Sequence, residues 1–334
     1  MIHSEPLRSY LTSGAFLSPL GLPAGTELEF SILGQGEYNL NYAFSHPVTG
    51  QKLVLRINLG SQMHLEDQIG YEFSALQALV PSGRTPKPLF CDSERNLLVM
   101  EWLPGGPLDY HRDMDTAAEI LADIHSVPVP AGCQLLRPAA PARAIYDECL
   151  EMVQHYFNWA DADPEVCRLL RELIAEIGKL PLTDASGAPV CIVNTELNSG
   201  NFLMDPTGRS HLVDWEKPLL SEPAQDLGHF LAPTTTFWKT DVILTPEEVR
   251  RFADRYIAAV GDRMDTSTLR QRLPLFFTVT CLRGVTWSAM ALREYCQPGR
   301  QLRNADTFAK LKAYINTEFL TNILENYVRK DFLA

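Results

Sequence analysis

Residues 191–216 constrain the fold more than any other stretch of this chain. They open with an apolar run, Cys191–Val193, that is typical of the end of a short strand. A polar loop, residues 194–201, follows it. Two short apolar runs joined by Asp-Pro-Thr-Gly come next, so residues 202–213 are predicted to form a β-hairpin.

Three polar side chains lie in the loops of this stretch. Glu196 and Asn201 belong to the polar loop, and Asp214 follows the second hairpin strand. A carboxylate can accept the proton of a hydroxyl group, and amide and carboxylate oxygens can hold a hard cation such as Mg²⁺. Asn201 follows Glu196 by five positions, which is the spacing of Asp and Asn in the catalytic loop of protein kinases.

The same stretch resembles the aminoglycoside phosphotransferase and choline kinase-like superfamily more closely still. In that superfamily the loop usually reads H-G-D-x-H-x-x-N, and the hairpin leads to I-D-W or I-D-F. Here the sequences are N-T-E-L-N-S-G-N and V-D-W-E. Asn194 replaces the first His, Glu196 replaces the base Asp, and Asn198 replaces the second His. The resemblance implies that Asn201 and Asp214 bind Mg²⁺ and that Glu196 is the catalytic residue.

The first hundred residues contain the periodic runs of a small antiparallel sheet with one helix. Apolar and polar residues alternate in two segments, a third segment follows the hairpin signal Thr49-Gly50, a fourth is continuously apolar, and one segment has helical spacing. We therefore expect strands at 27–33, 40–44, 52–57 and 97–100, and a helix over 65–80.

The turn between the first two strands is rich in glycine. Two glycines alone are weak evidence, and a plain hairpin is the simpler interpretation. However, Gly36, Asn39 and Tyr42 form G-x-x-N-x-x-Y, which resembles the superfamily's glycine loop. In such a loop, backbone N–H groups approach nucleotide phosphates. The resemblance thus assigns Gly34, Gly36 and Asn39 to cofactor binding.

Arg56 falls where the superfamily has a third-strand cation that contacts the α- and β-phosphates. A guanidinium group can grip phosphate through two N–H groups. Glu72 begins E-x-x-x-L-x-x-L, which looks like the superfamily's helix whose Glu pairs with that cation. We expect Arg56 and Glu72 to pair and to serve the nucleotide. The alternatives are a solvated arginine at a strand end and an exposed helical glutamate.

The composition turns to Pro and Gly after residue 101, which marks the clearest domain boundary. We expect an N-lobe at 1–101 and a C-lobe at 102–334. In the superfamily this position is the hinge, whose backbone binds adenine, so Glu101 and Trp102 are assigned to cofactor binding. An ordinary exit from strand to loop is the alternative.

The rest of the chain is predicted to be mainly helical. Helix starts are indicated by an N-cap pattern at Asp163 and by capping boxes at Thr116–Glu119 and Thr245–Glu248. The resemblance implies that Asp226 bonds the backbone of the catalytic loop. His125, at a helix end, is interpreted as structural.

Several aromatic residues of this region are open to two interpretations. Helical core is preferred, and the alternative is an acceptor pocket in which rings face a cationic substrate. The residues concerned are Trp238, Trp287 and Tyr295.

Composition narrows the classes of partner and compartment. The net charge of −12 disfavours non-specific nucleic-acid binding. The seven cysteines show no C-x-x-C spacing, which argues against zinc. We find neither a signal peptide nor an apolar stretch of the ~20 residues that span a bilayer. A cytoplasmic location, reduced thiols and no membrane partner are therefore expected.

Together these features predict an α+β, bilobal, protein kinase-like fold, with a small antiparallel β-sheet N-lobe and a larger, mainly helical C-lobe. The resemblance implies an ATP- and Mg²⁺-dependent kinase that phosphorylates a hydroxyl of a small molecule, such as an amino-alcohol, sugar or aminoglycoside-like compound. Glu196 is one methylene longer than Asp, so two alternatives stay open. They are a weak or inactive nucleotide-binding pseudokinase and a nucleotidyltransferase. The sequence specifies neither the acceptor nor the oligomeric state.

Overall fold

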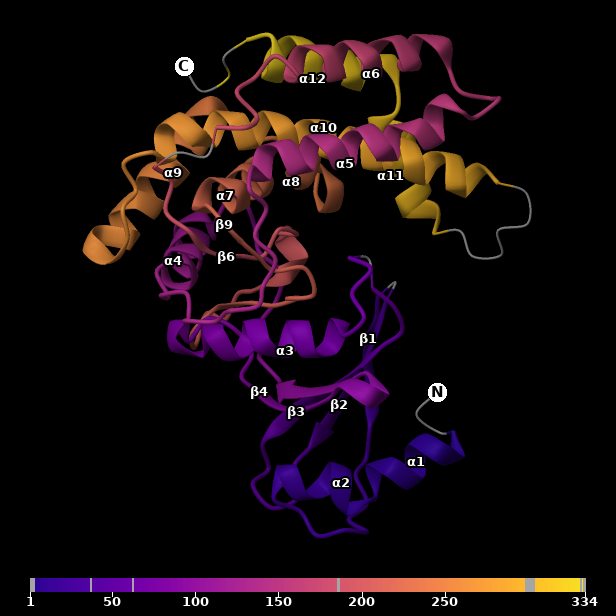
Figure 1. Ribbon diagram of the computed structural model, residues 1–334, viewed down its shortest axis with the longest axis vertical. Coiled ribbons are helices and arrows are strands. Elements are labelled where there is room, and N and C mark those ends of the chain that lie inside the picture. Colours follow the sequence, from indigo (N-terminus) through magenta and orange to yellow (C-terminus); the bar gives the residue numbers. More distant parts are fainter. Residues whose placement is uncertain are drawn as a thin grey trace. The chain divides into compact units, whose positions relative to one another are not determined.

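Figure 1 shows the computed structural model of the chain. The residues that it describes are 4–36, 38–61, 63–184, 187–297, 304–330 and 332. The chain divides into two compact units. The first comprises Met1–Gly106, Pro130–Leu135 and Phe202–Pro218, and the second comprises Pro107–Val129, Leu136–Asn201 and Leu219–Ala334. The hairpin that follows the polar loop thus belongs to the first unit, and the sequence-based division at residues 101 and 102 stays a prediction.

An antiparallel five-stranded sheet forms the centre of the first unit, with the strand order β1-β2-β3-β5-β4. Its strands are β1 (Ser31–Gln35), β2 (Asn39–Ser45), β3 (Lys52–Asn58), β4 (Pro88–Asp92) and β5 (Leu97–Glu101). The sequence predicted four of these, with β1 starting later than expected. It missed β4, a short, only partly buried edge strand that begins with Pro and lacks a clear alternation.

One face of this sheet is covered by short N-terminal helices that the sequence did not reveal. Phe16 and Leu17 are fully buried and join Leu53, Leu55 and Val99 of the sheet in one apolar cluster. The short elements are α1 (Glu5–Leu11), α2 (Gly14–Leu17) and the 3-10 turn η1 (Ser18–Leu20). The predicted helix is α3 (Gln68–Leu79), and Asp67 caps it by accepting a hydrogen bond from the backbone of Gly70.

The predicted hairpin is also present. Strands β7 (Phe202–Leu203) and β8 (His211–Leu212) pair in antiparallel fashion. Phe202 and Leu212 are fully buried, and the hairpin belongs to the first unit. Further short turns of this unit are η2 (Val80–Ser82) and η3 (Ser93–Arg95).

Helices dominate the second unit. They are α4 (Met114–His125), α5 (Pro141–Phe157), α6 (Pro164–Ile177), α7 (Pro223–Leu231), α8 (Pro233–Lys239), α9 (Pro246–Val260), α10 (Leu269–Cys296), α11 (Ala305–Tyr314) and α12 (Thr317–Ile323). Short 3-10 turns are η4 (Ser199–Asn201) and η5 (Gly261–Arg263), and η6 (Leu324–Val328) is a π-helical segment. A small two-stranded sheet pairs β6 (Cys191–Val193) with β9 (Leu219–Ser221). It holds both ends of the segment that includes the polar loop and the hairpin.

Helix α10 is the central element of this unit and packs along α5 and α7. Glycines allow its neighbours to come close. A Cβ on Gly228 of α7 would lie 2.7 Å from the carbonyl carbon of Phe276, and a Cβ on Gly284 of α10 would lie 2.4 Å from Cβ of Thr234. By length and composition α10 is apolar enough to cross a membrane, contrary to the sequence interpretation. However, 72% of its apolar window is buried inside the protein, as in a core helix.

The predicted helix starts are confirmed in two of three places. Asp163 accepts hydrogen bonds from the first turn of α6, and Thr245 and Glu248 form a capping box at α9. The predicted capping box at Thr116–Glu119 is wrong, because α4 begins two residues earlier, at Met114, without a side-chain cap. Glu119 instead forms an ion pair with Arg255 of α9, a long-range contact that a local pattern does not reveal.

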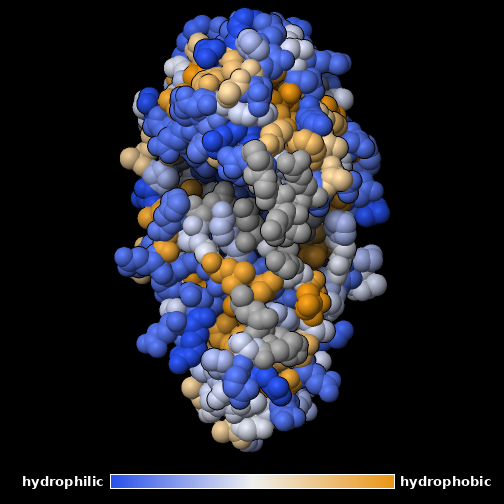
Figure 2. All heavy atoms as spheres, turned by 90° about the vertical axis from the view of Figure 1, so that its right-hand side faces the viewer, coloured by the Kyte–Doolittle hydropathy of each residue, from blue (hydrophilic) through white to orange (hydrophobic). Residues whose placement is uncertain are grey.

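The surface of the chain is mostly polar on the face shown in Figure 2, where hydrophobic side chains form patches between hydrophilic ones. Such a pattern is ordinary for a globular protein, since folded chains leave much apolar surface exposed.

Candidate functional site

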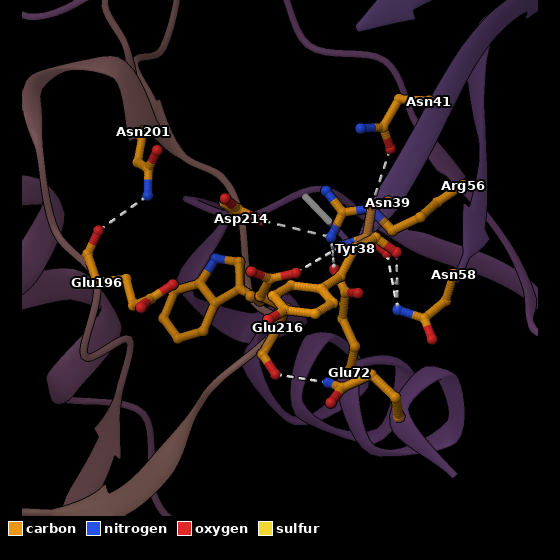
Figure 3. Close-up of polar contacts among 12 residues, drawn as sticks. Tyr38, Asn39, Asn41, Arg56, Asn58, Glu72, Glu196, Asn201, Asp214 and Glu216 are labelled. Atoms are coloured by element: carbon orange, nitrogen blue, oxygen red, sulfur yellow. Dashed lines mark hydrogen bonds and ion pairs between the residues drawn. The ribbon is translucent and has the colours of Figure 1, made fainter. Parts of the chain in front are cut away.

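Arg56 is the centre of a buried polar cluster in the first unit (Figure 3). Its Nη1 lies 2.5 Å from Glu72 Oε1 and 3.5 Å from Asp214 Oδ1. Its Nε donates a hydrogen bond to Asn41 Oδ1 at 3.0 Å. The side chains of Arg56 and Glu72 are only 8% and 2% exposed. The predicted contact between Arg56 and Glu72 is therefore present, and Asp214 joins it.

Local structure explains how these side chains meet. Asn41 lies opposite Arg56 in the register of β2 and β3, so the two side chains share one face of the sheet. Glu72 extends from α3, which contacts β4 and β5. Asp214 follows β8 with a φ of 66°, a left-handed backbone that is uncommon outside glycine and often marks functional positions.

The charges of this cluster depend on one another. Burial alone would lower the pKa of Arg56, but attraction by Glu72, and then by Asp214 and Glu216, outweighs burial and raises its pKa. Arg56 is therefore a permanent cation. Because it satisfies the buried Glu72 and also faces Asp214, it connects helix α3 to the carboxylate predicted to bind metal.

A second network fixes the segment after Asp214. Asn39 donates a hydrogen bond to the carboxylate of Glu216, and Asn58 donates one to Asn39 Oδ1 at 3.0 Å. Gln68 Nε2 donates to the backbone oxygen of Glu216 at 2.6 Å. Sequence reasoning assigned no role to Glu216. Its position two residues after Asp214 is the one local signal that it belongs to the site.

The residues predicted to form the glycine loop lie in and beside β1 and β2. Gly34 is in β1, and the N–H of Gly36 donates to the carbonyl of Asn39 at 2.8 Å. Glu37, in the same turn, falls outside the described residues. The Asn39 side chain is buried in the network above. The assignment of these three residues to a nucleotide stays a prediction.

The backbone at the predicted hinge is bonded within the sheet. The N–H of Glu101 donates to Lys87, and the N–H of Trp102 donates to Lys52. The Lys52 ammonium also lies 4.7 Å from the centre of a Trp102 ring, a cation–π contact. An adenine contact at these two residues would therefore use carbonyl groups, and this role stays a prediction.

In the second unit, Asp226 holds the start of the polar loop. Its carboxylate accepts hydrogen bonds from the N–H groups of Asn194 and Thr195, both at 2.8 Å. The same carboxylate lies 3.2 Å from His125 Nε2, and His125 Nδ1 lies 3.0 Å from the hydroxyl of Tyr256. Asp226 and His125 are therefore structural, as expected.

The polar loop is further fixed by its own asparagines. Asn194 Oδ1 accepts the N–H of Glu196 at 3.1 Å, and Asn198 Oδ1 accepts the N–H of Gly200 at 2.9 Å. Both asparagines that depart from the superfamily pattern thus stabilise the loop backbone. Thr195 has a φ of 71°, so the residue directly before Glu196 is also held in a left-handed conformation.

Asn201 has an orientation that suits a cation ligand. Its amide nitrogen donates to the backbone oxygen of Glu196 at 2.9 Å, and its amide oxygen points away from that contact (Figure 3). In the first unit, the Asp214 side chain is 38% exposed. Among the described residues, no group of three or more His, Cys, Asp and Glu could hold a metal alone. Amide and carboxylate oxygens are each ligands that Mg²⁺ accepts, and the assignment of Asn201 and Asp214 to a metal stays a prediction.

Glu222, the residue before α7, has a clear structural partner. Both its carboxylate oxygens accept hydrogen bonds from Arg272 of α10, at 2.7 and 2.5 Å. The two side chains are almost fully buried. Glu222 therefore forms a bidentate ion pair that joins the start of α7 to α10.

The aromatic residues singled out in the sequence pack against one another. Trp238 and Trp287 form an edge-to-face pair with ring centres 5.2 Å apart, and Tyr295 stacks on Phe308. Helix α8, which carries Trp238, contacts η4 at the end of the polar loop. All three side chains pack on neighbouring rings, but they are only half-buried and lie outside the buried core. A role in an acceptor pocket stays a prediction.

Comparison with known proteins identifies both family and fold. Residues 29–273 match the model of the Phosphotransferase enzyme family. The ethanolamine kinase of Plasmodium vivax is similar in structure, with a TM-score of 0.62, 16% identity, and coverage of 96% of this chain and 91% of that one. A choline kinase from Streptococcus pneumoniae matches with a TM-score of 0.60, 18% identity and coverage of 92% and 97%. A spectinomycin phosphotransferase, solved with ADP and spectinomycin, matches with a TM-score of 0.56 and 16% identity. The match covers 89% of this chain and 91% of that one. A search of curated protein sequences found no significant match.

Proposed function

The chain belongs to the Phosphotransferase enzyme family, and on this premise we propose that it transfers the γ-phosphate of ATP to a hydroxyl group of a small molecule in a Mg²⁺-dependent reaction. The fold that it shares with choline, ethanolamine and spectinomycin kinases supports this proposal. The observation that carries it is the buried cluster of Arg56, Glu72 and Asp214.

This cluster suits the nucleotide half of the reaction. Arg56 would neutralise the α- and β-phosphates, and Glu72 would hold it in place, as a Lys–Glu pair does in protein kinases. Asp214 and Asn201 would hold Mg²⁺, which bridges phosphate oxygens and neutralises their charge when bound. The backbone of Gly34, Gly36 and Asn39 would cover the phosphates, and the carbonyls at Glu101 and Trp102 would face the adenine.

The polar loop suits the acceptor half. Glu196 would accept a hydrogen bond from the acceptor hydroxyl, orient it for in-line attack and take its proton. Phosphoryl transfer depends mainly on positioning and charge neutralisation, so a firmly held glutamate can serve where an aspartate is usual. The loop N–H groups that donate to the carboxylate of Asp226 and to Asn194 Oδ1 supply that support. We place the reaction in the cytoplasm, where free thiols such as those of this chain persist.

The acceptor is proposed to be an amino-alcohol, a sugar or an aminoglycoside-like compound. The net charge of −12 favours the approach of cationic acceptors. Trp238 lies on α8, which contacts the end of the polar loop, and it packs on Trp287. Both rings are half-buried and offer apolar surface for such a molecule.

An assay with ATP labelled distinguishably at the α- and γ-phosphates tests this function. The protein is incubated with Mg²⁺ and with pools of amino-alcohols, sugars and aminoglycosides. We expect the γ label to appear in a small molecule of one pool, and EDTA to abolish the transfer. Appearance of the α label instead would establish a nucleotidyltransferase. Binding of ATP without transfer in any pool would favour a pseudokinase over the function proposed here.

A further inference from the structure

The side chain of Arg283 on α10 lies between two carboxylates of the second unit. Its Nη2 is 3.8 Å from Glu196 Oε1, and its Nε donates a hydrogen bond to Glu148 Oε2 at 3.2 Å. Arg283 is 20% exposed, Glu196 is 27% exposed, and Glu148, on α5, is 44% exposed. One guanidinium group thus connects a helix to the carboxylate proposed to act on the acceptor.

We propose that Arg283 is a positioning residue that holds the carboxylate of Glu196 in place for phosphoryl transfer, and that Glu148 anchors Arg283 in turn. This inference rests on the proposed function, because it assigns a partner to the proposed base. It also explains how this chain can use a glutamate where its relatives' motif has an aspartate.

A glutamate needs such a partner more than an aspartate does. Its additional methylene adds a rotatable bond, so its carboxylate can take up more positions around the same backbone. A displacement of ~1 Å of a catalytic group can lower a rate ~10²-fold. An arginine suits the task because its planar fork can bind two carboxylates at once and keeps its charge.

The electrostatics of the three groups agree with this arrangement. Burial alone would lower the pKa of Arg283, but attraction by Glu148 and then by Glu196 outweighs burial and raises its pKa. Arg283 therefore stays charged. Without it, Glu148 and Glu196 would lose the cation that lies 3.2 Å from the one carboxylate and 3.8 Å from the other.

The helix that carries Arg283 is firmly placed. Gly284, the next residue, allows α8 to approach so closely that a Cβ there would overlap with Thr234. Along its length α10 packs on α5, the helix of Glu148. Arg283 and its anchor therefore extend from two helices that are packed against each other, and such helices hold side chains more precisely than loops do.

Substitution of Arg283 separates this role from a purely structural one. We expect Arg283→Gln to lower kcat by about 10- to 100-fold while KM for ATP and the midpoint of thermal unfolding stay within error. Arg283→Lys keeps the positive charge but loses the planar guanidinium group, so we expect a loss of kcat between those of wild type and Arg283→Gln. Glu148→Gln is expected to lower kcat by a smaller factor, again without a change in KM for ATP or in the midpoint of thermal unfolding.

Arg270→Gln is the matched control. Arg270 lies on the same helix and pairs with Asp254 at an exposed position, so kcat should not change. A double-mutant cycle with Glu196→Asp completes the test, because a shorter side chain withdraws the carboxylate from Arg283. Arg283→Gln should then lower kcat by a much smaller factor in the Glu196→Asp variant than in the wild-type protein.

The possible outcomes separate the inference from the function on which it rests. Suppose that the wild-type protein transfers the γ-phosphate. If Arg283→Gln then leaves kcat unchanged, or lowers kcat by the same factor with Glu196 and with Asp at this position, the positioning role is wrong and the proposed function stands. A rise in the acceptor's KM with an unchanged kcat would also overturn the role, because Arg283 would then bind the acceptor. If the wild-type protein transfers no γ-phosphate, the proposed function fails and this inference fails with it.

Discussion

Replacement of Arg56 with Met is expected to lower the free energy of unfolding by about 3–5 kcal/mol and to abolish ATP binding in the measurable range. The substitution leaves the carboxylate of Glu72 buried without its cation, and an uncompensated buried charge is costly. Glu72 is only 2% exposed and lies 2.5 Å from the guanidinium group. Denaturant unfolding followed by circular dichroism and calorimetric titration with ATP·Mg²⁺ measure the two effects.

A double variant separates the two effects. Arg56→Met with Glu72→Leu removes both charges, and apolar replacement of a whole buried pair is often close to neutral for stability. We therefore expect the double variant to recover most of the lost stability without recovering ATP binding. If it regained ATP binding as well, Arg56 would be a structural residue only. As a surface control, Arg143→Met removes an exposed pair with Asp147 and should change neither quantity.

Asp226→Asn is expected to lower kcat by ~10²-fold and the free energy of unfolding by about 1–3 kcal/mol. Both oxygens of Asp226 accept backbone N–H groups of the polar loop. The amide of an asparagine directs an N–H group at one of these donors, so one loop hydrogen bond is lost and replaced by repulsion. Glu196 lies directly after this segment, and its carboxylate is displaced when the loop shifts. Steady-state kinetics and denaturant unfolding measure the two quantities.

Tyr256→Phe is the control for that effect. It removes the hydroxyl that contacts His125 and leaves the bonds between Asp226 and the loop intact. We expect a loss of about 1 kcal/mol in stability with an unchanged kcat. An equal fall of kcat in both variants would show that general destabilisation, and not placement of the loop, lowers the rate.

Local patterns in the sequence were sufficient for much of the fold. The hairpin at 202–213, the N-caps at Asp163 and Thr245 and the helix that carries Glu72 depend on residues close in the chain, and all were predicted. The contact between Arg56 and Glu72 was predicted because a resemblance to a known superfamily supplied a long-range partner. The order of the motifs along the chain made that resemblance specific.

The parts of the fold and of the candidate site that the sequence did not predict depend on contacts between residues far apart in the chain. Strand β4 is a short edge strand whose partner β5 defines it, and the true partner of Glu119 is on α9. Arg283 lies 135 residues from Glu148, and neither belongs to a recognisable motif. Their meeting follows from the packing of α5 on α10, which side-chain periodicity alone does not specify.

The rate of γ-phosphate transfer by Glu196→Gln, compared with wild type at saturating ATP and Mg²⁺, is the most direct measurement of whether this glutamate serves the reaction. The substitution keeps the size of the side chain and removes the carboxylate that would accept the hydroxyl proton. We predict that kcat falls by about 10²–10⁴-fold and that the affinity for ATP, measured by titration, does not change. Equal rates in the two proteins would contradict the assignment of Glu196 and with it the mechanism proposed here.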